Sequence, residues 1–182
     1  IKWIGIRLPI QRIAALCKLN GILFCTDAAQ TAGIIPISLK NSDIDYLCTA
    51  GHKGLYGPMG TGLLVINSDT IPESLIQGGT GSLSAQVNQP EILPDKFESG
   101  THNLLGIAGL NEGIKYVMNE SPQKIFDYEI SLAKNLYDGL SKIKDIELYT
   151  PKPDDDGFVP VVSFNIKNTD SEKTAQILND KF

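Results

Sequence analysis

Residues 22–33 read ILFCTDAAQTAG, and this segment gives the first indication of the fold class. Its first part, residues 22–27, is mostly apolar and predicts a short buried strand that ends at Asp27. Residues 9–20 predict a helix, because a proline opens the segment and a glycine directly follows it. A helix followed at once by a buried strand is typical of an α/β fold.

The rest of the chain continues with strands and helices. Further strands are predicted over residues 44–50, 62–66, 146–149 and 159–166, and further helices over 104–118, over 121–143 and from residue 171 onward. The strands over 44–50 and 62–66 are apolar without clean alternation, which favours a sheet covered on both faces. Residues 77–101 are rich in Gly, Ser, Gln and Pro and predict a long, ordered and functional loop.

Two long helices follow that loop. In the first, we expect one buried side formed by Leu110, Ile114, Val117 and Met118. In the second, the expected buried stripe is Ile125, Leu132, Leu136, Leu140 and Ile143. The chain changes in character near residues 105–120, so we place residues 1–110 in one domain and residues 111–182 in another.

Composition limits the class of protein. The chain has 182 residues, of which 42% are hydrophobic and 20% charged, and this is ordinary globular composition. With 16 basic and 21 acidic residues the net charge is −5, and no basic cluster favours a nucleic-acid or membrane partner. No apolar run approaches the roughly 20 residues that cross a bilayer. The chain starts at Ile1 and stops at Phe182 inside a helical pattern, so we expect part of a longer polypeptide.

The three cysteines are Cys17, Cys25 and Cys48, and each lies in an apolar stretch. An odd number of such cysteines predicts buried, reduced thiols in a cytoplasmic protein. Their spacing matches no zinc site, and the run at Asp154–Asp156 lacks the spacing of a calcium loop, so no metal is expected.

Two short motifs follow predicted strands. Asp27 and Gln30 belong to the first, at a strand end where ligands of open α/β sheets gather. A shielded carboxylate there would need a cation such as a protonated ring nitrogen, although for Asp27 taken alone the capping of a nearby turn is the commoner explanation. The second motif is Gly51-His52-Lys53-Gly54. A desolvated lysine between glycines can attack carbonyl groups, whereas an exposed loop lysine is the simpler alternative.

Two further motifs complete the set. Residues 55–62, LYGPMGTG, predict a turn that holds Lys53 in place rather than a nucleotide loop. Residues 97–103, FESGTHN, precede a predicted helix, where backbone N–H groups and a hydroxyl can hold a phosphate. A plain helix cap is the alternative for this last motif.

Together the motifs supply the parts of a pyridoxal phosphate site: a carboxylate for the pyridinium nitrogen, a lysine for a Schiff base and a phosphate-binding helix start. Their order resembles the class V aminotransferase family, and is most similar to its cysteine-desulfurase-like branch. The resemblance is carried by DAAQTAG (27–33), GHKGLYGPMGTG (51–62), GGTGS (78–82) and FESGTHNLLGIAGL (97–110). It is close over residues 5–118 and loose beyond them.

The resemblance implies a fold-type-I transferase, here the later part of a three-layer α/β/α large domain and part of a small α+β C-terminal domain. It also implies roles for five residues. Lys53 matches the Schiff-base lysine that later moves protons at the substrate carbon, and Asp27 matches the partner of the pyridine nitrogen. Gln30 matches the donor to the phenolic oxygen of the ring, and His52 matches a phosphate ligand. Thr101 matches a phosphate ligand from the neighbouring subunit, which implies a homodimer.

The sequence departs from the family pattern in places. Ala50 stands where relatives carry Ser or Thr on the phosphate, and strand alternation should turn Thr49 to the opposite face. His102 replaces a common Pro or Leu and has no assigned role. The family's ring-stacking aromatic residue would lie before Ile1, and its mobile cysteine and substrate-binding arginine beyond Phe182. None of the three cysteines present fits that mobile nucleophile.

The resemblance implies a desulfurase that converts L-cysteine to L-alanine and leaves sulfur as a persulfide on a cysteine, for passage to an acceptor protein. Two alternatives remain open at this point. The same motifs occur in family members that act as aminotransferases, epimerases or lyases. The chain could also be a non-catalytic fragment, because it lacks the nucleophilic cysteine, and we expect it to be inactive alone.

Overall fold

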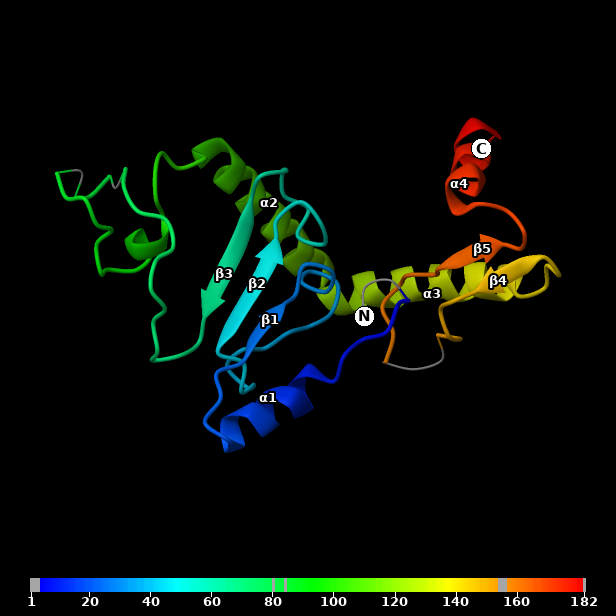
Figure 1. The fold of residues 1–182 in the computed structure, drawn as a ribbon, viewed down its shortest axis with the longest axis horizontal. Helices are drawn as coiled ribbons and strands as arrows, with labels where there is room; N and C mark the ends of the chain where they lie inside the picture. Colours follow the sequence, from blue (N-terminus) through cyan, green and yellow to red (C-terminus); the bar gives the residue numbers. More distant parts are fainter. Residues whose placement is uncertain (1–3, 80, 84, 154–156, 182) are drawn as a thin grey trace.

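A computed structural model describes residues 4–79, 81–83, 85–153 and 157–181, so the predicted turn at Asp154–Asp156 lies outside the described residues. The helices are α1 (Ile10–Leu19), α2 (Leu104–Glu120), α3 (Pro122–Leu140), α4 (Ser171–Lys181) and a short 3-10 helix, η1 (Asp95–Phe97). The strands are β1 (Cys25–Asp27), β2 (Tyr46–Ala50), β3 (Gly62–Ile66), β4 (Ile146–Leu148) and β5 (Phe164–Ile166). This order of elements confirms the predicted mixed α/β fold (Figure 1).

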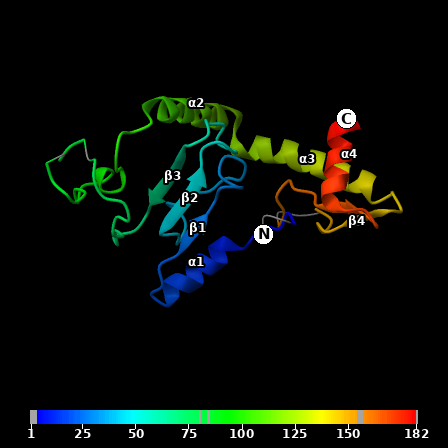
Figure 2. The ribbon, with the colours of Figure 1, turned by 45° about the horizontal axis from the view of Figure 1, so that its top comes forward.

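The first sheet has the order β1-β2-β3. Strand β1 pairs in parallel with β2, with Asp27 opposite Cys48, and β2 pairs antiparallel with β3, with Ala50 opposite Gly62. Helix α2 runs along this sheet, and α3 continues from α2 toward the second half of the molecule (Figures 1 and 2). The parallel pair therefore brings the ends of β1 and β2 to the same edge of the sheet.

The second sheet is the antiparallel pair β4-β5, which lies beside α3 and α4 (Figure 2). An isolated antiparallel bridge between Ile6 and Phe158 ties the N-terminal segment to this half. A hydrophobic core joins the two halves. It consists of Ile35 from the turn after β1, Phe126, Ile130 and Ala133 from α3, and Val159.

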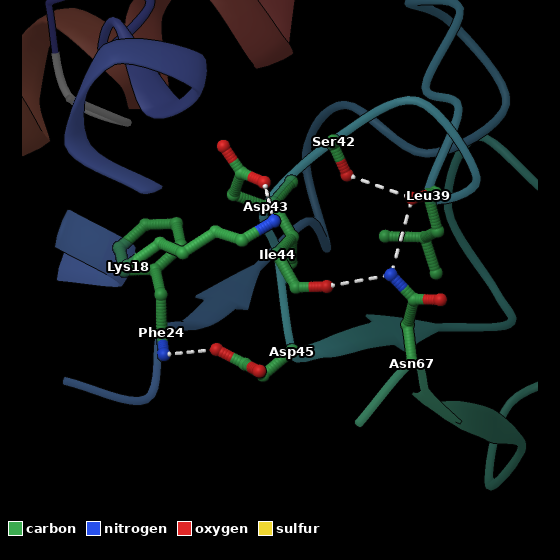
Figure 3. A network of polar contacts seen from close by, with 8 residues as sticks. All are labelled: Lys18, Phe24, Leu39, Ser42, Asp43, Ile44, Asp45 and Asn67. Atoms are coloured by element: carbon green, nitrogen blue, oxygen red, sulfur yellow. Dashed lines mark hydrogen bonds and ion pairs between the residues drawn. The ribbon is translucent and has the colours of Figure 1, made fainter. Parts of the chain in front are cut away.

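A network of polar contacts fixes β1 and β2 at the end remote from Asp27 (Figure 3). The backbone N–H of Phe24 donates to Asp45 Oδ2 at 2.7 Å, and the Phe24 carbonyl accepts from the N–H groups of Asp45 and Tyr46. The side-chain amide of Asn67 donates to the carbonyls of Leu39 and Ile44, each at 3.1 Å. These bonds set the register of the strands, and a slip of one residue would turn every side chain to the other face.

Several predicted strands are shorter in the structure than expected. The strand predicted over 22–27 begins only at Cys25, because the N–H of Phe24 donates to the Asp45 side chain and not to the backbone of a neighbouring strand. The strand predicted over 159–166 begins only at Phe164. Pro160 has no N–H to donate, and the N–H of Val161 bonds the carbonyl of Val159 within a local turn.

The expected buried stripe of α3 is wrong. The buried side chains are Phe126, Ile130 and Ala133, whereas Leu132 and Leu136 are each 49% exposed. Both stripes have helical spacing, so periodicity alone could not choose between them. The stripe that is buried is the one that packs against Ile35 and Val159, two residues far away in the sequence.

The expectation of a sheet covered on both faces is not met within this chain. Leu63 and Leu64 are successive residues of β3 and point to opposite faces, yet they are 39% and 47% exposed. No helix in the described ranges is long and apolar enough to span a bilayer. The domain division after residue 110 remains a prediction, and that position lies inside the continuous helix α2.

Replacing Phe126 by alanine should test the corrected face of α3. We expect a loss of about 3–5 kcal/mol in the free energy of unfolding, because the change removes a buried aromatic side chain from the core. Leu136→Ala on the exposed stripe should cost below about 1 kcal/mol. Chemical denaturation of both variants measures this, and a greater loss for Leu136→Ala would contradict the assignment.

Glu129 gives a prediction for the pH dependence of stability. Burial raises the pKa of this carboxyl above its ordinary value of 4.5. Folding therefore favours the protonated form, and Glu129 destabilises the protein as pH rises from 4.5 through the raised value. Glu129→Gln should raise the melting temperature at neutral pH and make little difference well below pH 4.5. Glu120→Gln at an exposed position serves as the control. An equal rise in the melting temperature there would show that burial of Glu129 is not the cause.

Candidate functional site

Asp27 is the last residue of β1, and its position is set by hydrogen bonds on both sides. The N–H of Ala28 donates to the carbonyl of Cys48 on β2 at 2.8 Å, which extends the parallel pairing past the strand. Asp27 Oδ1 accepts from the N–H of Ala29 at 2.8 Å, so the turn-capping contact considered from the sequence is present. The carboxyl group is exposed in this chain, and its second oxygen, Oδ2, faces no described donor at hydrogen-bond distance.

The turn after Asp27 is wound tightly. The N–H groups of Thr31 and Ala32 both donate to the carbonyl of Ala28, at 2.9 and 2.8 Å. This winding leaves Gln30 half-buried, and Gln30 and Asp27 line the same cavity. The structure thus brings together the first two predicted site residues.

Lys53 lies in the loop that joins β2 to β3. The N–H of Gly51 donates to the Thr61 carbonyl at 2.8 Å, and the N–H of Gly57 donates back to the Gly51 carbonyl at 2.8 Å. The N–H of Tyr56 donates to the Lys53 carbonyl at 2.9 Å. These bonds close the loop, with Lys53 half-buried and its neighbour His52 exposed.

A direct backbone contact joins the lysine loop to the turn after Asp27. A Cβ placed on Gly33 would collide with the carbonyl of Gly54, and a Cβ placed on Gly54 would collide with the carbonyl of Ala32. Gly33 also has φ of +86°, a conformation that side chains rarely adopt. Only glycine at both positions allows the two loops to approach so closely, and this approach places Lys53 beside the Asp27 turn.

Helix α2 packs directly against the lysine loop. A Cβ on Gly113 would meet the carbonyl of Leu55, so the helix and loop backbones are in contact. The rings of Tyr56 and Tyr116 pack edge to face, with centroids 5.3 Å apart. Burial raises the pKa of Tyr56 above 10. The predicted scaffold role of residues 55–62 agrees with these contacts.

Thr101 and His102 are exposed just before α2. The cap of α2 is Asn103, whose Oδ1 accepts from the N–H of Gly106 at 3.0 Å. The N–H of Gly100 donates to the carbonyl of Gly78 at 3.2 Å, which ties two glycine-containing motifs together. Among the described residues, no contact joins Thr101 to Asp27 or Lys53 within one chain.

The cavity at the end of β1 has a volume of about 210 Å³. Asp27 and Gln30 line it, whereas Lys53, His52 and Thr101 do not. Arg7 also lines it, and sequence reasoning missed this residue. Arg7 belongs to none of the motifs, and only its position directly before the predicted helix over 9–20 could have drawn attention to it.

The prediction that the cysteines are buried is wrong for Cys25, which is exposed, and only partly right for Cys17 and Cys48, which are half-buried. Burial, together with neighbouring Cys25 and Asp27, raises the pKa of the Cys48 thiol above 9.0. The raised pKa favours the unreactive protonated thiol. Thr49 lines the apolar cavity under α2 and so faces away from the Asp27 side, as strand alternation predicted.

The comparisons with known proteins agree with this geometry. The model of the family described as aminotransferase class-V matches residues 2–181, so the chain belongs to that family. The chain is 33% identical over 184 residues to a probable cysteine desulfurase of Pyrococcus abyssi, covering 97% of this chain and 45% of that protein. It is 32% identical over 170 residues to a cysteine desulfurase of Salmonella agona, covering 91% and 41% respectively.

Solved structures show the same relationship. An apo structure of a cysteine desulfurase from Thermococcus onnurineus NA1 has a TM-score of 0.86 and 33% identity, over 97% of this chain and 44% of that one. The cysteine desulfurase CsdA of Escherichia coli has a TM-score of 0.82 at 23% identity, over 94% of this chain and 43% of that one, and shows a common fold. The architecture is therefore the predicted fold type I, and the chain spans less than half the length of these relatives.

The contact between the two glycines gives a test of the site. Gly54→Ala should displace the lysine loop and lower the free energy of unfolding by more than about 1 kcal/mol, because its Cβ meets backbone that cannot rotate away. Gly139→Ala is the matched control, since nothing lies within 4 Å of a Cβ there. Thermal unfolding of both variants measures the difference, and equal stability would show that the loops do not need this close approach.

Proposed function

We propose that the chain is the cofactor-binding part of a pyridoxal phosphate-dependent cysteine desulfurase. One observation carries the proposal: the parallel pairing of β1 with β2, together with the Gly33–Gly54 contact, puts the Asp27 turn and the Lys53 loop side by side. The relatives named as cysteine desulfurases support the choice of reaction within the family.

The residues present fit the cofactor by their chemistry and by the space around them. An amine, a carboxylate, an amide, an imidazole and a hydroxyl are the groups that the aldehyde, ring nitrogen, phenolic oxygen and phosphate require. The glycines of both loops leave no room for side chains between the loop backbones. Two loops whose backbones are in direct contact hold the side chains that they carry in fixed positions.

Each residue then has a defined task. Lys53 would hold the cofactor aldehyde through its amine and, once released, would move a proton at the substrate α-carbon. The Asp27 carboxylate would accept a hydrogen bond from the protonated ring nitrogen, and Gln30 would donate to the phenolic oxygen. When bound, the cofactor supplies an electron sink that stabilises negative charge on the α-carbon.

His52 and Thr101 would donate to the phosphate, with Thr101 reaching the site of a partner subunit in a homodimer. The exposure of Thr101 supports this arrangement, as does that of large apolar side chains on the surface, since Leu75, Val87 and Leu105 are 98%, 86% and 89% exposed. Exposed apolar surface of this kind is typical of a subunit interface.

The proposed overall reaction converts L-cysteine to L-alanine and leaves sulfur as a persulfide. The sulfur-accepting cysteine is proposed to lie outside these 182 residues, because Cys17 lies in helix α1 and Cys25 and Cys48 lie in strands, so none of the three is in a loop that could carry sulfur away. From there the sulfur would pass to an acceptor protein. Three free thiols also support a cytoplasmic location for the protein.

Labelling with the cofactor tests the role of Lys53. The protein incubated with pyridoxal phosphate should turn yellow, and borohydride should fix the cofactor to Lys53, as peptide mass spectrometry would show. Lys53→Ala should abolish fixation, because the amine is gone, whereas Lys40→Ala at an exposed lysine should label as the unchanged protein does. Undiminished fixation in Lys53→Ala would refute the assignment.

The reaction is tested on the full-length protein. Alanine released from L-cysteine is measured over time, with Lys53→Ala as the inactive control. Absence of alanine from a cofactor-loaded sample would reject desulfuration while leaving cofactor binding intact.

A further inference from the structure

The loop between β3 and α2 contains a buried lysine to which the proposed function gives no role. This loop extends away from the sheet before the chain returns at the start of α2 (Figures 1 and 2). Lys96 lies in its short helix η1, and the side chain is only 6% exposed. A lysine is almost never buried without a charge partner, because its ammonium group loses hydration. The partners of Lys96 therefore indicate what its burial does for the loop.

Two carboxylates from different parts of the loop pair with Lys96. Its Nζ donates to Glu91 Oε2 at 2.7 Å and lies 3.9 Å from Glu73 Oε2. The hydrogen bond to Glu91 raises the pKa of Lys96 above its ordinary value of 10.5, so the amine stays charged at neutral pH. The first contact lies within the returning limb of the loop, residues 89–101, and the second joins it to the outgoing limb, residues 73–79. Salt screens a covered charge less than an exposed one.

The same two limbs are joined at two further places. The Gln77 side-chain carbonyl accepts from the N–H of Gln89, and the N–H of Gly100 donates to the Gly78 carbonyl at 3.2 Å. A Cβ placed on Gly79 would lie 2.9 Å from the Cα of Gly100, so the limb backbones are in direct contact there. The returning limb is therefore held by the outgoing limb up to its last residues.

Thr101 follows directly on this joined stretch. It is exposed and comes next after Gly100, five positions after Lys96. Between these positions the N–H of Lys96 donates to the carbonyl of Ile92 at 2.8 Å, which closes the turn that η1 continues. The place of the Thr101 hydroxyl thus depends on how the two limbs are held.

We propose that Lys96 is a positioning residue that fixes where the Thr101 hydroxyl meets the cofactor phosphate, because it holds the returning limb in shape and joins it to the outgoing limb. The inference rests on the proposed function in one respect, the role of Thr101 as a phosphate ligand. Lys96 touches neither cofactor nor substrate and acts through Thr101. Its loss should therefore be felt only at the phosphate end of the cofactor.

Cofactor binding to the full-length protein tests the inference. The bound cofactor is removed, and the protein is titrated with pyridoxal phosphate and, separately, with pyridoxal, which lacks the phosphate. Lys96→Met keeps a long side chain and removes the charge. It should weaken pyridoxal phosphate binding about tenfold, the effect of one hydrogen bond to a charged group, and leave pyridoxal binding unchanged. Lys96→Arg keeps a cation for Glu91 and should restore pyridoxal phosphate binding.

A double variant separates positioning from a general loosening of the structure. Thr101→Val alone should weaken pyridoxal phosphate binding at least as much as Lys96→Met does. Because Lys96 acts through the Thr101 hydroxyl, adding Lys96→Met to Thr101→Val should cause no further loss. Two losses that multiply would show that Lys96 acts independently, and would overturn the inference.

Lys115→Met is the matched control, because Lys115 also pairs with a glutamate at 2.7 Å but is 60% exposed on α2. It should bind both ligands as the unchanged protein does. Lys96→Met should fold, since Glu73 and Glu91 are 92% and 82% exposed and are left in water. Circular dichroism and melting temperature check this. If the variant does not fold, Glu73→Gln takes its place and should weaken pyridoxal phosphate binding alone.

The inference and the proposed function fail in different ways. Lys96→Met that weakens both ligands equally, or neither, rejects the role of Lys96, while a loss in Thr101→Val still supports Thr101 as a phosphate ligand. Thr101→Val that binds pyridoxal phosphate as the unchanged protein does rejects that ligand, and the inference with it. Fixation of the cofactor to Lys53 is measured separately and stands apart from both results.

Discussion

The parallel pairing of β1 with β2 is the constraint on which the site depends. It sets Asp27 opposite Cys48 and brings the lysine loop to the same edge of the sheet. The bonds around Phe24 and Asp45, at the other end of the strands, hold this register (Figure 3). Because side chains alternate along a strand, a slip of one residue would turn Asp27 to the opposite face. Contacts remote from the chemistry therefore decide which groups can take part in it.

The position of Lys53 depends on the strand register and on contacts between loop backbones, and not on contacts of its own side chain. Gly33 and Gly54 let two loops touch, and α2 supports the lysine loop through Gly113. No charge partner of Lys53 is needed for this placement, so its amine stays available for a ligand. Loops whose backbones pack this closely are also rigid. A reacting group can be held in a fixed orientation only if the loop that carries it is rigid.

Local motifs were enough to predict that Asp27 and Gln30 lie at the end of β1 and that Lys53 lies in the loop after β2, while the roles of these residues stay predictions. Local motifs could not predict what depends on contacts between distant segments. The buried face of α3 is an example, since Phe126 and Leu136 both lie on stripes of helical spacing and only the packing against Val159 separates them. Arg7 is another, because it reaches the cavity through a bridge to residues some 150 positions later in the chain.

That bridge means that two distant parts of the chain build the cavity at the end of β1. Asp27 and Gln30 come from β1 and the turn after it, whereas Arg7 is positioned by the segment around Phe158. The same segment packs on α3 through Val159, so one wall of this cavity belongs to the core that joins the two halves. A change in this core can therefore alter the cavity beside Asp27 without changing the backbone contact between Gly33 and Gly54 that places the lysine loop.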